Sequence, residues 1–219
     1  METLYQFFQY VTHIDVYLLS FVSTHGSWTY VVLFLIIFCE TGLVITPFLP
    51  GDSLLFAAGT ITANPESDLN IQLLTFTLLL AAMLGNKSNY LIGKNFGTRL
   101  FQGKSRLFNR KYLQDTQTFY AKHGGKTIIL ARFIPIIRTF APFVAGLSRM
   151  RLQEFTFYNA ISALLWVGSL TMAGYLFGNI PAVKEHFSMV VYGIIVVSLI
   201  PAVFTFLLHK VRKHSKAAN

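Results

Sequence analysis

Four ionisable side chains lie inside long apolar stretches of this 219-residue chain: Glu40, Asp52, Arg132 and Arg138. A charge in the hydrocarbon core of a bilayer costs from about 3 to more than 10 kcal/mol. Such residues are therefore retained when they are paired, hydrated or functional. Two acids and two bases also offer two kinds of chemistry, proton uptake by the carboxylates and anion binding by the guanidinium groups.

Glu40 and Asp52 are the candidate proton-coupling residues. Glu40 follows an apolar run, where a desolvated carboxylate can take up and release a proton near neutral pH. Asp52 follows a Pro-Gly pair, and its alternative role is the N-cap of a half-helix that begins at Ser53. The alternative for Glu40 is a structural ion pair with an arginine. Both alternatives are compatible with transport.

Arg132 and Arg138 are the candidate ligands for an anionic head group. They are six residues apart with Pro135 between them, and a helix break at this proline would turn both side chains toward one cavity. Arginine binds phosphate or carboxylate through a planar, bidentate fork. The structural alternative is two ion pairs, in which Glu40 and Asp52 pair with the two arginines and lock the halves of the chain together.

The rest of the sequence offers no enzymatic constellation. It contains no phosphate-binding Gly-rich loop, no cluster of histidines with metal-ligand spacing and no GxSxG nucleophile elbow. We therefore expect no metal, no cofactor and no enzymatic activity. An intramembrane enzyme such as a lipid phosphatase is disfavoured, because a nucleophile or metal set is missing.

The composition predicts an all-α integral membrane protein. Hydrophobic residues make up 53% of the chain and charged residues 12%, whereas soluble domains carry about 25% charged residues. The uncharged segments 155–183 and 188–208 each exceed the roughly 20 residues that cross a hydrocarbon core. We expect spans at 71–93, 155–178 and 188–208, an interfacial helix at 1–27, and a last unit at 181–219 that ends in a basic tail.

Two further apolar units, 28–62 and 127–147, are interrupted by prolines and glycines. A broken helix survives at membrane depth only when protein buries it or it faces a water-filled cavity. Each unit is therefore predicted to be a re-entrant hairpin of two half-helices. Each precedes a span, and the two orientations are opposite, which predicts an inverted repeat of the kind found in secondary transporters. The residues expected to make the breaks or close packing are Pro47, Pro50, Gly51, Pro135, Pro142 and Gly146.

The net charge of +9 follows membrane topology and does not indicate nucleic-acid binding. No Lys or Arg precedes Lys87, and the basic residues concentrate in 87–126 and 210–216. Short cytoplasmic loops are enriched in Lys and Arg. The loop at 94–126 and the C-terminus are thus expected in the cytoplasm, and the loop at 63–70 outside.

Three sequence blocks resemble the DedA family of bacterial inner-membrane proteins, also called the VTT or SNARE-associated domain family. The blocks are 40–52, with the acids and a Pro-Gly pair; 85–97, with Gly85 and Asn86; and 132–146, with the two arginines. The resemblance implies re-entrant hairpins, dependence on the proton-motive force, and a role in envelope homeostasis and cell division. It also implies that the residues matching Glu40, Asp52, Arg132 and Arg138 are functional. Many members carry aspartate where this chain has Asn86, which removes one possible protonation site.

Together these features predict a proton-coupled transporter or flippase for a lipid phosphate, with undecaprenyl phosphate or a phospholipid as the substrate. The expected partners are a membrane lipid and protons, and the expected location is the bacterial inner membrane. Two alternatives remain open. A proton/cation antiporter would use the acids and treat the arginines as structural, and a non-transporting scaffold for division proteins would tolerate Glu40→Gln.

Overall fold

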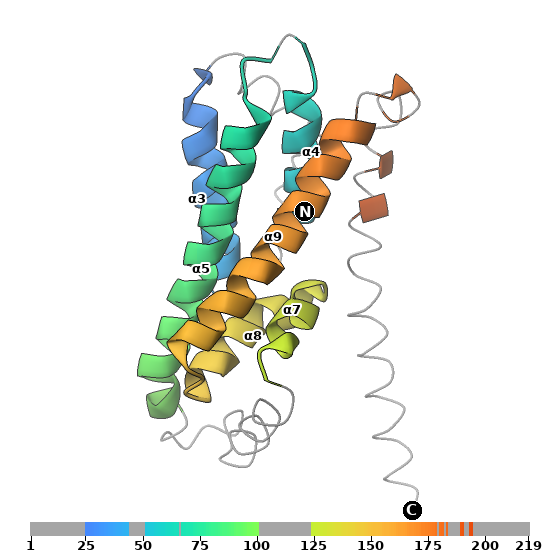
Figure 1. The fold of residues 1–219 in the computed structure, drawn as a ribbon. Coiled ribbons are helices and arrows are strands. Elements are labelled where there is room, and N and C mark those ends of the chain that lie inside the picture. Colours follow the sequence, from blue (N-terminus) through green and yellow to red (C-terminus); the bar gives the residue numbers. More distant parts are fainter. Residues whose placement is uncertain are drawn as a thin grey trace, which may run out of the picture.

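The computed structural model describes residues 25–43, 51–65, 67–100 and 124–178, with a few residues between 180 and 194. Six helices have defined bounds in these ranges: α3 (Trp28–Gly42), α4 (Gly51–Thr62), α5 (Ile71–Leu100), α7 (Lys126–Arg132), α8 (Pro135–Leu147) and α9 (Leu152–Phe177). They are arranged as Figure 1 shows. No strand occurs in the described ranges. The predicted all-helical class is therefore confirmed for this part of the chain.

Helices α5 and α9 are the two long elements, and by length and composition both can cross a membrane. They correspond to the spans predicted at 71–93 and 155–178. Helix α5 continues through the basic residues to Leu100, and the membrane boundary predicted after residue 93 stays a prediction. Helical hydrogen bonds do not require apolar side chains, so a helix can extend beyond the segment that lipid would cover. Residues 1–24, the rest of the loop up to residue 123, and most of the span predicted at 188–208 lie outside the described residues.

The two units with predicted breaks are each divided into two helices. In the first unit α3 ends at Gly42 and α4 is described from Gly51, while Pro47 and Pro50 lie outside the described residues. In the second unit α7 ends at Arg132 and α8 begins at Pro135. Proline suits this first helical position, because its missing N–H would have no partner there.

Glycines bring the two halves of the chain into close contact. Helices α4 and α9 approach each other at Gly59 and Gly174, and α5 and α8 approach at Gly93 and Gly146. At each of these four positions an added Cβ would overlap a backbone carbonyl group of the facing helix. The second helix of each interrupted unit thus packs on the long helix of the other half (Figure 1).

Two apolar clusters lie on either side of one pocket. The larger cluster joins α3, α4, α5 and α9 and includes Trp166. The smaller one is formed by Tyr90, Ile128, Ala145 and Phe155. Trp166 and Ile128 also line one common pocket, so this pocket lies between the two clusters.

Candidate functional site

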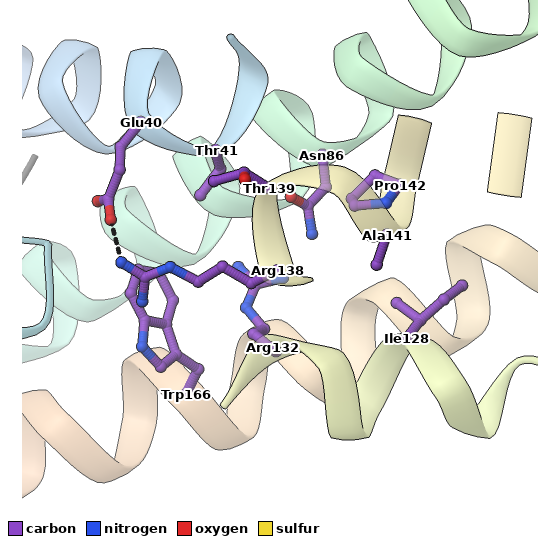
Figure 2. A pocket seen from close by; sticks show the side chains of 10 residues that line it. All are labelled: Glu40, Thr41, Asn86, Ile128, Arg132, Arg138, Thr139, Ala141, Pro142 and Trp166. Carbon is purple, nitrogen blue, oxygen red and sulfur yellow. Dashed lines mark hydrogen bonds and ion pairs between the residues drawn. The ribbon is translucent and has the colours of Figure 1, made fainter. Parts of the chain in front are cut away.

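Arg138 holds both predicted acids. Its Nη1 lies 2.6 Å from Asp52 Oδ1, and its Nη2 forms an ion pair with Glu40 Oε1 (Figure 2). The exposed fractions of the three side chains are 10% for Arg138, 1% for Glu40 and 16% for Asp52. Residues far apart in the sequence are therefore joined in one desolvated, charge-assisted cluster.

Helix ends explain part of this pairing. Glu40 lies in the last turn of α3 and Arg138 in the first turn of α8, where each charge is disfavoured by the dipole of its own helix. Pairing offsets both unfavourable interactions. Asp52 lies in the first turn of α4, an end that favours a negative charge. The alternative role of Asp52 as the N-cap of a helix from Ser53 is wrong, because α4 already includes Gly51 and Asp52.

Arg132 differs from Arg138 in having only neutral partners. This last residue of α7 is 4% exposed, and its Nη1 donates hydrogen bonds to Asn159 Oδ1 at 3.3 Å and Ser162 Oγ at 3.2 Å. Within the described residues, no carboxylate lies within 4.0 Å of this guanidinium group, and its Nη2 has no hydrogen-bond partner. The two ion pairs of the structural alternative are thus present, but both are made to Arg138 and none to Arg132 among the described residues.

Trp166 contacts three of the four charged residues. Its ring centroid lies 4.9 Å from Cζ of Arg132 and 5.1 Å from Cζ of Arg138, which are cation–π distances. Its Nε1 donates a hydrogen bond of 2.8 Å to Asp52 Oδ1. The side chain comes from α9 and is 3% exposed. The indole therefore attaches the charges on the two interrupted units to a long helix.

Buried amides surround the arginines. Asn86 Nδ2 donates to Asn159 Oδ1 at 2.8 Å, and Asn159 Nδ2 donates to the carbonyl oxygen of Met83 at 3.0 Å. These bonds fix the orientation of the Asn159 amide, so that its oxygen faces Arg132. Asn86 is thus connected to Arg132 through one neutral side chain.

No motif in the sequence predicted that Asn159, Ser162 and Trp166 belong to the site. Their spacing of three and four places all three on one face of α9. A polar face at this period in an otherwise apolar span is a signal that could have found them. It is weak, because single polar or aromatic residues are common in such helices.

Two of the predicted break and packing residues, Gly51 and Pro142, lie next to the charged side chains. A Cβ at Gly51 would overlap the carboxylate of Glu40, and a Cβ at Gly146 would overlap the backbone of α5. Pro142 lies inside α8 and lines the pocket. The functional roles predicted for Glu40, Asp52 and the arginines stay predictions, and so does the role of these residues in a re-entrant hairpin.

The charged side chains border a small pocket whose lining includes Glu40, Arg132, Arg138, Trp166 and Pro142 (Figure 2). Its free space is about 10 Å³, which is room for about one water molecule. A phosphate group is larger, so it enters only if side chains move. In the described part of the chain, no group of three or more His, Cys, Asp or Glu residues is placed to hold a metal ion.

Comparison with known proteins adds relatives over the full length of the chain. The VTT domain family matches residues 49–176, a range that includes Asp52 and both arginines. The protein DedA of Escherichia coli K12 is 52% identical over 100% of both chains. The chain belongs to the DedA family. No solved structure matches it.

Other members of the DedA family cover most of the chain. The inner membrane protein YqjA of Escherichia coli K12 is 37% identical over 85% of this chain and 84% of its own length. An uncharacterized membrane protein of Mycobacterium tuberculosis is 40% identical over 85% of this chain and 82% of its own. The three motif blocks alone favour YghB and its paralogue YqjA, but identity to DedA is higher than identity to YqjA. The protein is a membrane protein, and large apolar side chains are exposed on α5 and α9, among them Phe76 and Leu164.

Proposed function

We propose that this protein is a proton-coupled transporter of the bacterial inner membrane that moves a lipid phosphate across the bilayer. Undecaprenyl phosphate or a phospholipid would be the substrate, and the process would support envelope homeostasis and cell division. The observation that carries the proposal is the unequal division of charge in the site. Arg138 holds both carboxylates, whereas Arg132 is buried among neutral partners.

A buried cation without a counter-ion is unfavourable, because desolvation is not offset by an ion pair. Arg132 donates its hydrogen bonds to Asn159 and Ser162 from Nη1 alone, and Nη2 has no partner among the described residues. A phosphate oxygen bound there would supply both the missing charge and the missing acceptor. Arg132 is therefore the primary head-group ligand in this proposal.

Glu40 and Asp52 would couple this binding to protons. While ionised, they hold Arg138 and the pocket stays too small for a phosphate group. Protonation weakens their hold, and Arg138 can then join Arg132 on the head group. Loss of the protons restores the ion pairs and releases the anion. The coupling follows from a substrate that binds one of two states better than the other.

A lipid substrate agrees with the surroundings of the site. Ile128, Ala141 and Pro142 give the pocket an apolar side, and α5 and α9 expose large apolar side chains. An acyl or prenyl chain could thus stay in the bilayer while its head group enters. We infer further that the interrupted units are re-entrant hairpins of an inverted repeat, with the C-terminus in the cytoplasm. The matching glycine contacts of α4 with α9 and of α8 with α5 support this arrangement.

The test is transbilayer movement of labelled undecaprenyl phosphate and phospholipid in proteoliposomes, with and without a pH gradient. The wild type is expected to move one of them, and Arg132→Ala to move neither. Arg151→Ala is the matched control, because it removes an equal charge from an exposed residue outside the site. Lipid movement by Arg132→Ala at the wild-type rate would refute the proposal.

A proton/cation antiporter is the second candidate, favoured by the attachment of both acids to one arginine. It predicts cation-dependent proton flux, measured with a trapped pH dye, and no lipid movement. Absence of both activities would favour the scaffold, which also predicts normal division with Glu40→Gln.

A further inference from the structure

Trp166 is placed to determine which arginine the carboxylates occupy. It donates its only hydrogen bond to Asp52 Oδ1, the oxygen that also accepts from Arg138, and its ring lies against both guanidinium groups. We propose that Trp166 is a positioning residue that keeps Asp52 on Arg138 and so leaves Arg132 available to the phosphate group. This inference rests on the proposed function.

The indole suits this positioning role because its N–H group only donates hydrogen bonds and does not lose its proton. It therefore stabilises the ionised carboxylate in one place. Glu40 and Asp52 both interact electrostatically with Arg132 beyond ion-pair distance, Glu40 more strongly, so this second cation is an alternative partner for a released carboxylate. The negatively polarised ring face attracts both guanidinium groups and disfavours a carboxylate over it.

Trp166 lies in the middle of a long helix, whereas the groups that it contacts lie at the ends of shorter helices. Its side chain is 3% exposed and belongs to the larger apolar cluster. Asp52 and the two arginines come from α4, α8 and α7, beside the helix breaks. The indole on α9 thus contacts charged helix ends from both interrupted units.

Binding of undecaprenyl phosphate to purified protein in detergent tests this role. Trp166→Phe keeps an aromatic face but removes the N–H group, and we expect binding to weaken about tenfold or more as Asp52 moves to Arg132. In an Asp52→Asn background the same substitution should change binding less than about twofold, because asparagine cannot neutralise Arg132. Trp28→Phe is the control, since Trp28 is 67% exposed.

Equal losses in both backgrounds would show a purely structural role and overturn the inference, as would unchanged binding by Trp166→Phe. Either result leaves the proposed function standing, provided that the wild type binds. If the wild type does not bind the lipid, the proposed function fails and the inference fails with it.

A second measurement covers the case in which Trp166→Phe does not fold. The chain contains two tryptophans, so Trp28→Phe leaves Trp166 as the only indole emitter. Titration with undecaprenyl phosphate should change its emission in parallel with binding, because the ligand would neutralise a cation 4.9 Å from the ring centroid. Saturable binding with unchanged emission would overturn the inference.

Discussion

The two arginines should differ sharply in their effect on stability. Arg138→Met removes the ion-pair partner of Glu40 and Asp52. The Glu40 carboxylate, which is 1% exposed, is then left without an ion pair. Breaking a buried pair in this way costs about 3–5 kcal/mol. Arg132→Met removes a buried cation with no carboxylate partner among the described residues, at the loss of two hydrogen bonds to neutral groups. Removal of the desolvation cost of the buried cation offsets this loss, so we expect the free energy of unfolding to change by no more than about 1 kcal/mol.

Thermal unfolding of the purified variants in detergent measures the difference. For a chain of this size, 1 kcal/mol corresponds to about 2–4 °C in Tm, so Arg138→Met should unfold about 10 °C below the wild type. Arg132→Met should stay within about 4 °C. In a Glu40→Gln, Asp52→Asn background the effect of Arg138→Met should shrink to a few degrees, because no buried charge is left unpaired. Equal losses for the two arginine variants would refute the assignment of both acids to Arg138.

Three further substitutions, one of them with a control substitution on the same helix, test other features of the structure. Arg132→Lys should slow lipid movement about tenfold or more in proteoliposomes, because lysine lacks the bidentate fork, whereas an antiporter would tolerate it. Gly174→Ala should lower the free energy of unfolding by about 1–3 kcal/mol, because its Cβ meets a carbonyl of α4. A Cβ added at Gly168 on the same helix meets no atom within 4 Å, so Gly168→Ala should leave the free energy of unfolding unchanged or raise it slightly. Equal losses of stability at the two positions would contradict the close approach of α4 and α9. Gly51→Ala should displace the Glu40 carboxylate and abolish lipid movement in proteoliposomes. Lipid movement at the wild-type rate would contradict the contact between Gly51 and Glu40.

The charged candidates could be found from the sequence because they are chemical outliers. An acid or arginine in an apolar segment is unfavourable enough to be conspicuous in any arrangement of the helices. The neutral members of the site are not conspicuous in this way. Asn159, Ser162 and Trp166 are ordinary residues for an apolar helix, and only their contacts with the charges distinguish them.

The bounds of the helices were partly predictable. Pro135 correctly predicted a new helix after Arg132, because proline fixes φ and lacks the N–H that a helix interior needs. Helix α5 extends beyond the span predicted to end at residue 93, because the change from apolar to basic residues marks a change of environment and not the end of helical hydrogen bonding. The residues predicted to break the first unit, Pro47 and Pro50, lie outside the described residues.

The sequence by itself determined that the protein is helical, that it belongs in a membrane, and that four charges must be accommodated in apolar surroundings. These properties follow from composition and from local preferences, which act over a few residues. Only the tertiary structure decided that both acids meet Arg138, that Arg132 is left to neutral partners, and that Trp166 lies against both arginines. Pairing energies depend on distances between helices far apart in the chain, and the glycine contacts that set those distances act only once the helices pack.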